Sequence, residues 1–115
     1  MDMNPLEKYC EYLGKKDLDA LCGLYADKFI FDDRGGQDLG RPPFIKESME
    51  EYRAAMAAVF AAPGTWEITC LGTAYGNVVF YDVRRGDTVL PCVAICRTDK
   101  TGKITEFRVF VREQE

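Results

Sequence analysis

The spacing of apolar residues changes at Pro63-Gly64, and this change constrains the fold more than any other feature of the sequence. Before it, apolar residues mostly recur about every 3.6 positions, which is typical of amphipathic helices. After it, they follow a period of two, which is typical of strands. Helices segregated from a run of strands predict an α+β domain with its helices packed on a sheet.

Three helices and one short strand are predicted in the first half. The second helix is expected to begin after Asp17, whose side chain is placed to cap it, and to include Tyr25 in its apolar stripe. Three glycines and two prolines between Arg34 and Pro43 predict a loop. The other elements are expected as helices at Leu6 to Gly14 and Phe44 to Ala62 and as a strand at Phe29 to Asp33.

Four strands joined by short turns are predicted in the second half. Tyr75-Gly76, Gly86-Asp87 and the stretch 99–102 are connections typical of hairpins, so the sheet should be mostly antiparallel. The strands are expected at Thr65 to Ala74, Asn77 to Arg85, Thr88 to Arg97 and Lys103 to Arg112.

One of these strands is apolar on both faces. Cys92, Ala94 and Cys96 share one face, and Val93 and Ile95 share the other. An antiparallel strand with one solvated face should alternate polar and apolar residues, so something must cover the second face. We expect a homodimer through the outer sheet face, whose apolar residues are Val93, Ile95 and Phe110.

The composition excludes several classes of function. The 115 residues suffice for a single domain, 1–115, and the fifteen Lys and Arg are scattered in a chain of net charge -4, so nucleic acid is not an expected partner. No signal peptide or membrane-spanning run is visible, which predicts a cytoplasmic protein with no membrane partner. The five cysteines lack disulfide or metal-ligand spacing and should be reduced, with no metal and no cofactor. The chain has no histidine, so acid-base chemistry must use other side chains.

Two stretches carry a resemblance to a known family. Residues 17–33 combine an acidic helix start, a Leu-Tyr-Ala-Asp stretch and a strand ending in an acid, and a glycine-rich loop then reaches Gly40-Arg41; residues 97–104 form the second stretch. They resemble the SnoaL-like and ketosteroid isomerase branch of the NTF2-like superfamily over nearly the whole chain. The resemblance implies the NTF2-like (cystatin-like) cone, in which three N-terminal helices and a curved sheet enclose a pocket for a small organic molecule. Because this fold serves several enzyme classes and plain binding domains, it leaves the function open.

The resemblance also implies a catalytic pair. Tyr9 falls where ketosteroid isomerases place the tyrosine that donates to the substrate oxyanion, and Asp33 falls where they place the carboxylate that moves the proton. Tyr25 matches a tyrosine that supports the first through a hydrogen bond in some members. The acid that completes the oxyanion hole has no counterpart, because Ala94 stands at its position.

The residues by themselves leave alternatives open. Asp33 has the strand parity of Phe29 and Phe31, so it faces the interior if they do; otherwise it caps the Gly35-Gly36 turn. Tyr9 is otherwise an amphipathic tyrosine with its hydroxyl in water, and Tyr25 and Tyr52 are otherwise core residues.

An apolar pocket is expected between the helices and the sheet. Asp82 would be a second pocket carboxylate with Arg84 as its partner, or both would be solvated at the hairpin tip. The remaining lining residues are expected to be Tyr25, Phe31, Met49, Tyr52, Met56, Trp66, Phe80, Cys92, Ala94, Cys96 and Phe107.

Two functional hypotheses follow. The first is an isomerase-like enzyme in which Asp33 transfers a proton on a small apolar carbonyl compound and Tyr9 stabilises the developing charge. The alternative is a non-catalytic ligand-binding or dimerising domain of the same fold.

Overall fold

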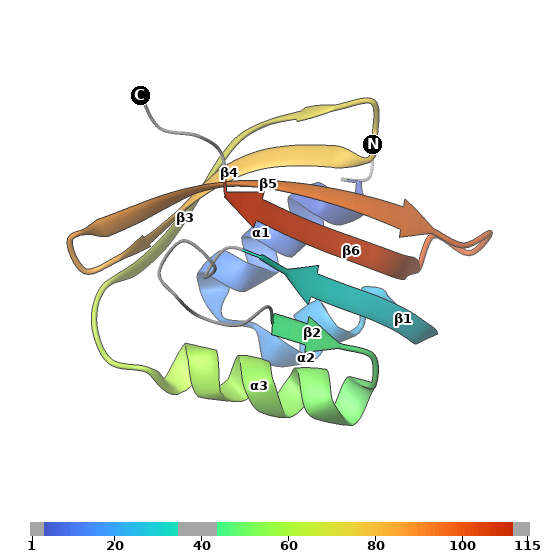
Figure 1. The fold of residues 1–115 in the computed structure, drawn as a ribbon, viewed down its shortest axis with the longest axis horizontal. Coiled ribbons are helices and arrows are strands. Elements are labelled where there is room, and N and C mark those ends of the chain that lie inside the picture. The colour runs from blue at the N-terminus through green and yellow to red at the C-terminus, as the bar shows by residue number, and fades with distance from the viewer. Residues whose placement is uncertain (1–3, 35–43, 112–115) are drawn as a thin grey trace.

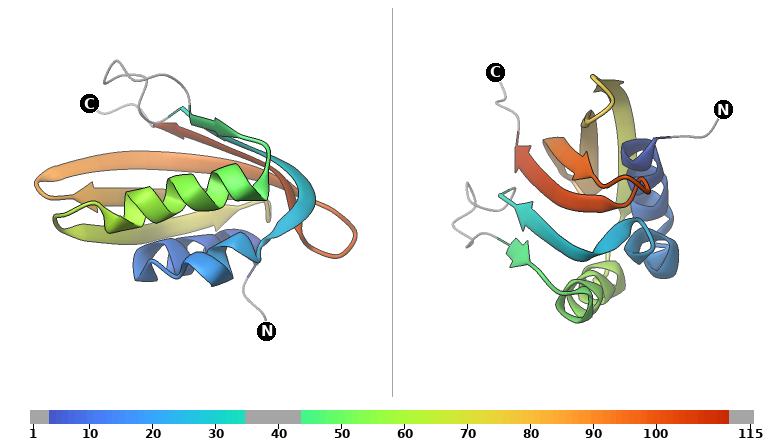
Figure 2. Two further views of the ribbon diagram at one scale, coloured as in Figure 1. Left: turned by 90° about the horizontal axis from the view of Figure 1, so that it is seen from below. Right: turned by 90° about the vertical axis from the view of Figure 1, so that its right-hand side faces the viewer.

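A six-stranded sheet curls around the helices, which all lie on its concave side, so that no described helix covers its outer face (Figures 1 and 2). The computed structural model describes residues 4–34 and 44–111. The helices are α1 (Pro5–Lys15), α2 (Leu18–Cys22) and α3 (Met49–Ala61). The strands are β1 (Tyr25–Asp33), β2 (Phe44–Lys46), β3 (Trp66–Ala74), β4 (Val78–Arg85), β5 (Thr88–Thr98) and β6 (Ile104–Val111).

The sheet has the order β2-β1-β6-β5-β4-β3. Only the β1–β6 pair is parallel, and every other neighbouring pair is antiparallel. The predicted α+β fold with a curved, mostly antiparallel sheet is therefore confirmed. The turn at Tyr75-Gly76 is the predicted hairpin, and both of its residues have the positive φ angles that such two-residue turns use.

Two boundaries in the first half differ from the prediction. Tyr25 is the first residue of β1 rather than the last of the second helix, because the Leu24 carbonyl accepts a hydrogen bond from the Ile104 amide and starts the pairing with β6. The segment Phe44–Lys46 is a strand paired with β1 rather than the first turn of the third helix, and Ile45 is exposed on it.

The later start of α3 follows from its N-cap residue, Ser48. The Ser48 side chain accepts a hydrogen bond from the Glu51 amide (3.2 Å) and donates one to the Glu51 carboxylate (3.1 Å). This reciprocal pair fixes the first turn at Met49. The preceding residues are then free to pair with β1.

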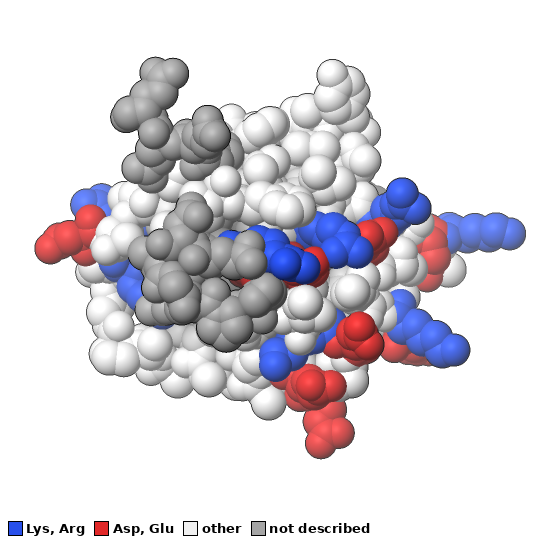
Figure 3. Space-filling view, in the orientation of Figure 1, with Lys and Arg blue, Asp and Glu red and all other residues white. Residues whose placement is uncertain are grey.

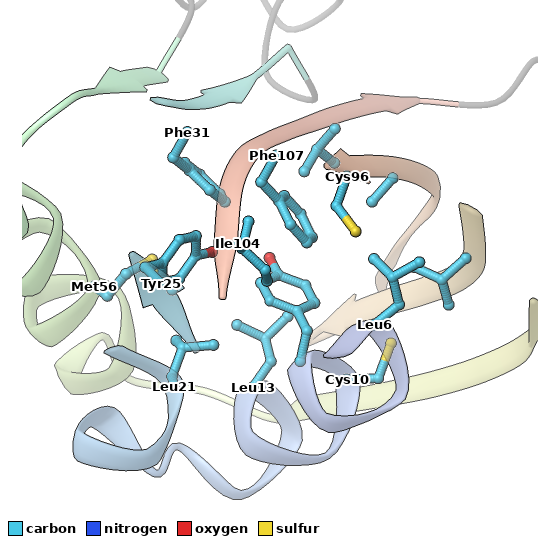
Figure 4. Close-up of a cluster of buried hydrophobic side chains, with 14 of the residues drawn as sticks. Leu6, Cys10, Leu13, Leu21, Tyr25, Phe31, Met56, Cys96, Ile104 and Phe107 are labelled. Carbon is cyan, nitrogen blue, oxygen red and sulfur yellow. The ribbon is translucent and has the colours of Figure 1, made fainter. Parts of the chain in front are cut away.

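One buried core lies between the helices and the concave face of the sheet. Figure 4 shows Phe31 and Phe107 on the sheet side, with Leu13, Leu21 and Met56 reaching them from the helices. None of the helices in the described residues is long and apolar enough to cross a membrane. The expected loop from Arg34 to Pro43 and the end of the last strand at Arg112 lie outside the described residues, apart from Arg34 itself.

Candidate functional site

Helix α1 carries Tyr9 into the interior. Asn4 caps the helix by accepting a hydrogen bond from the Glu7 amide (2.9 Å), and Pro5 follows at the first helical position, where its missing N–H costs nothing. The apolar stripe of the helix then faces the sheet. Tyr9 is 3% exposed, with its ring centroid 4.3 Å from that of Phe107.

Strand β1 places Asp33 on the same interior face. Asp33 pairs with Val109 of β6, and the amide of the next residue donates to the Val109 carbonyl (2.9 Å), which fixes the strand end. Phe29 and Phe31, which share its parity, are buried, and Asp33 itself is half-buried. Burial is the main cause that raises the pKa of the Tyr9 phenol, and the neighbouring groups Tyr81, Tyr52 and Asp33 add to it in that order. Both residues predicted to be catalytic thus lie on the interior side of the fold, Tyr9 from helix α1 and Asp33 from strand β1.

Ala94 lies in the same row across the sheet as Asp33. Val109 pairs with Asp33 on one side and with Ala94 on the other, so Ala94 is two strands away, about 10 Å. It is 0% exposed. The position therefore offers a buried methyl group where the family places a carboxyl group.

The interior also contains four buried tyrosines, whose hydroxyls form two pairs. The hydroxyls of Tyr25 and Tyr52 are 3.1 Å apart, and the side chains of Tyr9 and Tyr81 are hydrogen-bonded to each other. Burial is the main cause that raises the pKa of each of the four phenols above its usual value. They are therefore neutral hydrogen-bond donors at physiological pH. The Tyr25 hydroxyl, which the resemblance relates to Tyr9, pairs with Tyr52.

The side chains expected to line a pocket are mostly packed against one another. The rings of Phe31 and Phe107 stack with centroids 5.5 Å apart, and Tyr52 is 0% exposed. Met49 and Trp66 are only partly buried, and the Trp66 indole donates to the Leu13 carbonyl (2.9 Å), which ties β3 to α1. The other buried members of the set are Met56, Cys92 and Cys96.

The parity expected for β4 is wrong. Phe80 is 37% exposed on the outer face, whereas Val79 and Tyr81 are buried on the inner face. Asp82 and Arg84 alternate with Tyr81 and thus lie on the outer side. All four residues 78–81 are apolar or aromatic, so they do not show which face of β4 is buried. Asp82 and Arg84 are polar and share one parity, which indicates the solvent-facing side. Their parity could therefore have placed Tyr81 on the inner face, where it meets Tyr9.

An ion network on the outer face was not predicted. Asp32 is the buried charged residue of the described chain, and it accepts hydrogen bonds from Arg34 (2.6 and 3.1 Å) and Arg108 (2.6 Å). Arg108 also donates to Glu106 (2.7 Å). The hydrogen bonds and charges of Arg34 and Arg108 lower the pKa of Asp32, although burial opposes the shift. The network joins β1 to β6 next to Asp33.

We expect the Asp32→Asn variant to lower the free energy of unfolding at pH 7 by about 1–3 kcal/mol, since it removes a buried charge bonded to two arginines that remain partly solvated. The folded pKa is below the unfolded one, so this contribution is present above about pH 4 and is lost as the pH falls through the folded value. Urea unfolding at pH 7 and pH 3 measures the difference, which should shrink at pH 3. The exposed Asp27 of the same strand gives the control variant, Asp27→Asn; an equal loss in both variants contradicts the assignment.

Within residues 4–34 and 44–111, no group of three or more Cys, Asp or Glu side chains is arranged to hold a metal ion. The five cysteines form no disulfide in the structure. The site therefore consists of a carboxylate and neutral phenols in an aromatic interior.

Comparisons with known proteins agree with the observed fold. A family model described as a SnoaL-like domain matches residues 6–107. None of the curated proteins matches the sequence. Among solved structures, a candidate ketosteroid isomerase from Kribbella flavida is similar at a TM-score of 0.72 and 18% identity, covering 96% of this chain and 77% of the other.

Two further structures show the same fold. A protein from Catenulispora acidiphila with a ketosteroid isomerase-like fold, in complex with trimethylamine, has a TM-score of 0.72 and 14% identity over 96% of this chain and 86% of its own. An NTF2-like protein of unknown function from Cytophaga hutchinsonii has a TM-score of 0.69 and 15% identity over 94% and 87%. The family model covers most of the chain, and the chain therefore belongs to the SnoaL-like domain family, with an NTF2-like fold.

Proposed function

We propose that this protein binds a small apolar carbonyl compound and moves a proton on it. In this proposal Asp33 removes the proton next to the carbonyl group, and the Tyr9 hydroxyl donates a hydrogen bond to the oxygen as it becomes an enolate. The observation that carries the proposal is that Asp33 and Tyr9 belong to the same interior face: Asp33 has the strand parity of buried Phe31, Phe31 pairs with Phe107, and the Tyr9 ring packs 4.3 Å from that of Phe107. The family membership and the ketosteroid isomerase-like fold agree with it.

The chemistry requires a base near the C–H group next to the carbonyl and a neutral hydrogen-bond donor near the carbonyl oxygen. A positioned carboxylate can serve as the general base in a chain without histidine. A buried neutral phenol is a strong donor to developing negative charge, because few water molecules compete for it. To reach the substrate oxygen, the Tyr9 hydroxyl must exchange its hydrogen bond to Tyr81 for one to the ligand.

Ala94 limits the expected rate. Loss of one oxyanion donor typically costs about 10²–10³-fold in rate, so an enzyme with only the Tyr9 donor should be slow on substrates that need two. The packed interior adds a second requirement, since a ligand must displace aromatic side chains.

The test is hydrogen exchange at ketones. Cyclohexanone and larger cyclic ketones, incubated with the protein in D₂O, should exchange the hydrogens next to the carbonyl faster than in buffer, as followed by NMR. An equal concentration of the urea-unfolded chain serves as the blank for free carboxylates. No acceleration with any ketone of the series would refute the catalytic proposal.

We expect the Tyr9→Phe variant to bind 2-naphthol, a neutral enolate mimic, about 1–3 kcal/mol more weakly, which is roughly 5- to 150-fold in Kd. The phenol of the ligand loses one buried hydrogen bond, while the ring packing against Phe107 is retained. Fluorescence titration measures the affinity. Tyr12→Phe on the same helix is the matched control, because Tyr12 is only partly buried and is not one of the four buried tyrosines. Equal affinities of parent and Tyr9→Phe proteins would remove Tyr9 from the site.

A second candidate function is a non-catalytic dimerising domain. Two observations favour it: the packed interior, and the outer sheet face, on which Phe80, Val93 and Phe110 pair in one row across three strands. Figure 3 shows this face, with a band of charged side chains across its middle and an uncharged surface above it over β4 and β5. We propose that a second copy of the chain covers this surface. A dimer without ketone exchange or naphthol binding would establish this function in place of the first.

The trimethylamine complex of the Catenulispora protein suggests a competing ligand. An aromatic interior with a carboxylate could also hold a small cation over its rings. Tetramethylammonium should therefore be titrated beside 2-naphthol. Saturable binding of the cation alone would contradict the carbonyl proposal.

A further inference from the structure

Helix α1 and edge strand β3 run antiparallel and in close contact, which places two cysteines opposite each other. The indole of Trp66 donates to the Leu13 carbonyl, and a Cβ at Gly14 would lie 3.5 Å from the Cβ of Ile68. Both views of Figure 2 show α1 beside β3. Cys10 lies one helical turn before Gly14, about 6 Å away along the helix axis. Cys70 lies two residues after Ile68, about 7 Å away along β3. Because the two elements are antiparallel, both cysteines lie on the same side of the Gly14–Ile68 contact and at nearly the same distance from it.

The side chains of the two cysteines point toward each other. Cys10 belongs to the helix stripe that faces the sheet. Cys70 pairs with Tyr81, whose side chain is buried on the inner face, and directly opposite residues of an antiparallel pair share a face. The side chains of Cys10 and Cys70 are hydrogen-bonded, and burial together with the neighbouring Cys70 raises the pKa of the Cys10 thiol to about 12.

The two sulfurs differ in access. Cys70 is exposed on the edge strand, whereas Cys10 is buried beneath it. A third thiol, Cys92, lies one strand beyond Tyr81 in the same row, and its S–H group donates to the Leu90 carbonyl (3.7 Å). The arrangement therefore offers one sulfur to solvent and one specific partner behind it.

We propose that Cys70 and Cys10 form a reversible disulfide when the protein meets a hydroperoxide. The Cys70 sulfur attacks the peroxide, the O–O bond breaks, and Cys70 becomes a sulfenic acid while water or an alcohol leaves. The Cys10 sulfur then attacks the Cys70 sulfur, the S–O bond breaks, and the Cys10 proton leaves with that oxygen as water. Two thiols lose two electrons in total and the peroxide gains them.

The link would fasten α1 to the edge of the sheet. Tyr9 is the neighbour of Cys10 on this helix, so the disulfide would act on the element that carries it. The inference is independent of the proposed function, because it requires only the packing of α1 on β3.

Mass spectrometry of the intact chain tests the proposal. The native protein is treated with hydrogen peroxide, alkylated and digested with trypsin. Cleavage after Lys8, Lys15, Arg53 and Arg84 gives peptides 9–15 and 54–84, which contain Cys10 and Cys70 as their single cysteines. A linked pair of these two peptides, lost on treatment with dithiothreitol, is expected, and the free thiols should fall from five to three as one pair is consumed.

The controls separate this pair from other oxidation products. The Cys70→Ser variant should give no linked peptide, whereas Cys96→Ser, which removes a buried thiol elsewhere on the sheet, should retain it. Oxidation in urea should give mixed pairings, which shows that the native selectivity comes from the fold. A Cys70–Cys92 link, an intermolecular Cys70 link, or sulfinic acid at Cys70 with Cys10 still alkylated would each overturn the proposal.

Discussion

Replacing Asp33 with Asn should lower the protein-dependent rate of hydrogen exchange at cyclic ketones by about 10²–10⁴-fold, the usual contribution of a general base. The amide has nearly the same shape as the carboxylate but cannot accept the proton. Because Asp33 is half-buried at a strand end whose backbone is fixed to β6, the fold should be retained. The measurement is the NMR exchange rate, together with urea unfolding to verify that the variant is folded.

Asp82→Asn is the matched control for this prediction. Asp82 is also a half-buried strand carboxylate, but it lies on the outer face of β4. Its replacement should leave the exchange rate unchanged. If both variants lose activity, or if Asp33→Asn keeps it, the base is not Asp33 and the catalytic proposal fails.

The Ile95→Lys variant should convert a dimer of this protein into monomers or make it insoluble. Ile95 is 43% exposed on the outer face, next to the row of Phe80, Val93 and Phe110. A lysine there would place an unpaired charge in the centre of the proposed interface, where burial of a charge is strongly unfavourable. Sedimentation velocity of the parent and variant proteins at equal concentration measures the change.

Val89→Lys is the comparison that makes this result specific. Val89 is also 43% exposed on β5, but it lies six residues away toward the hairpin, about 20 Å along the strand. This variant should remain a dimer. A monomeric parent protein, or an Ile95→Lys variant that sediments as the parent dimer does, would show that this face is not the interface.

The sequence predicted the fold well where a local pattern determined the structure. The hairpin turns and the two apolar faces of residues 90–96 could be predicted because each strand pairs with its neighbour in the sequence. The inward direction of Asp33 could be predicted because it shares the strand parity of Phe29 and Phe31. These features depend on the alternation of side chains along one strand. The predicted placement of Asp33 and Tyr9 toward one interior followed from such local rules.

The features that the sequence did not predict depend on contacts between residues that lie far apart in the sequence. Strand β2 forms because β1 offers a free edge, and Tyr25 joins β1 because β6 pairs with Leu24. The Asp32 network needs Arg108, which is 76 residues away. Tyr81 was missed because a run of four apolar residues conceals the parity of β4. Neither spacing nor composition reports such long-range contacts.

The parallel pairing of β1 with β6 has a consequence for how the chain reaches its native state. Phe31 pairs with Phe107, so the first strand finds its central partner only near the other end of the described chain. During synthesis, α1, α2 and β1 are made long before β6, so their apolar faces stay exposed until β6 has left the ribosome and can pair with β1. Pairing of such distant segments also slows folding in general. Shortened chains that lack β6 should therefore be prone to aggregation, whereas internal changes at the β3–β4 hairpin should affect folding much less.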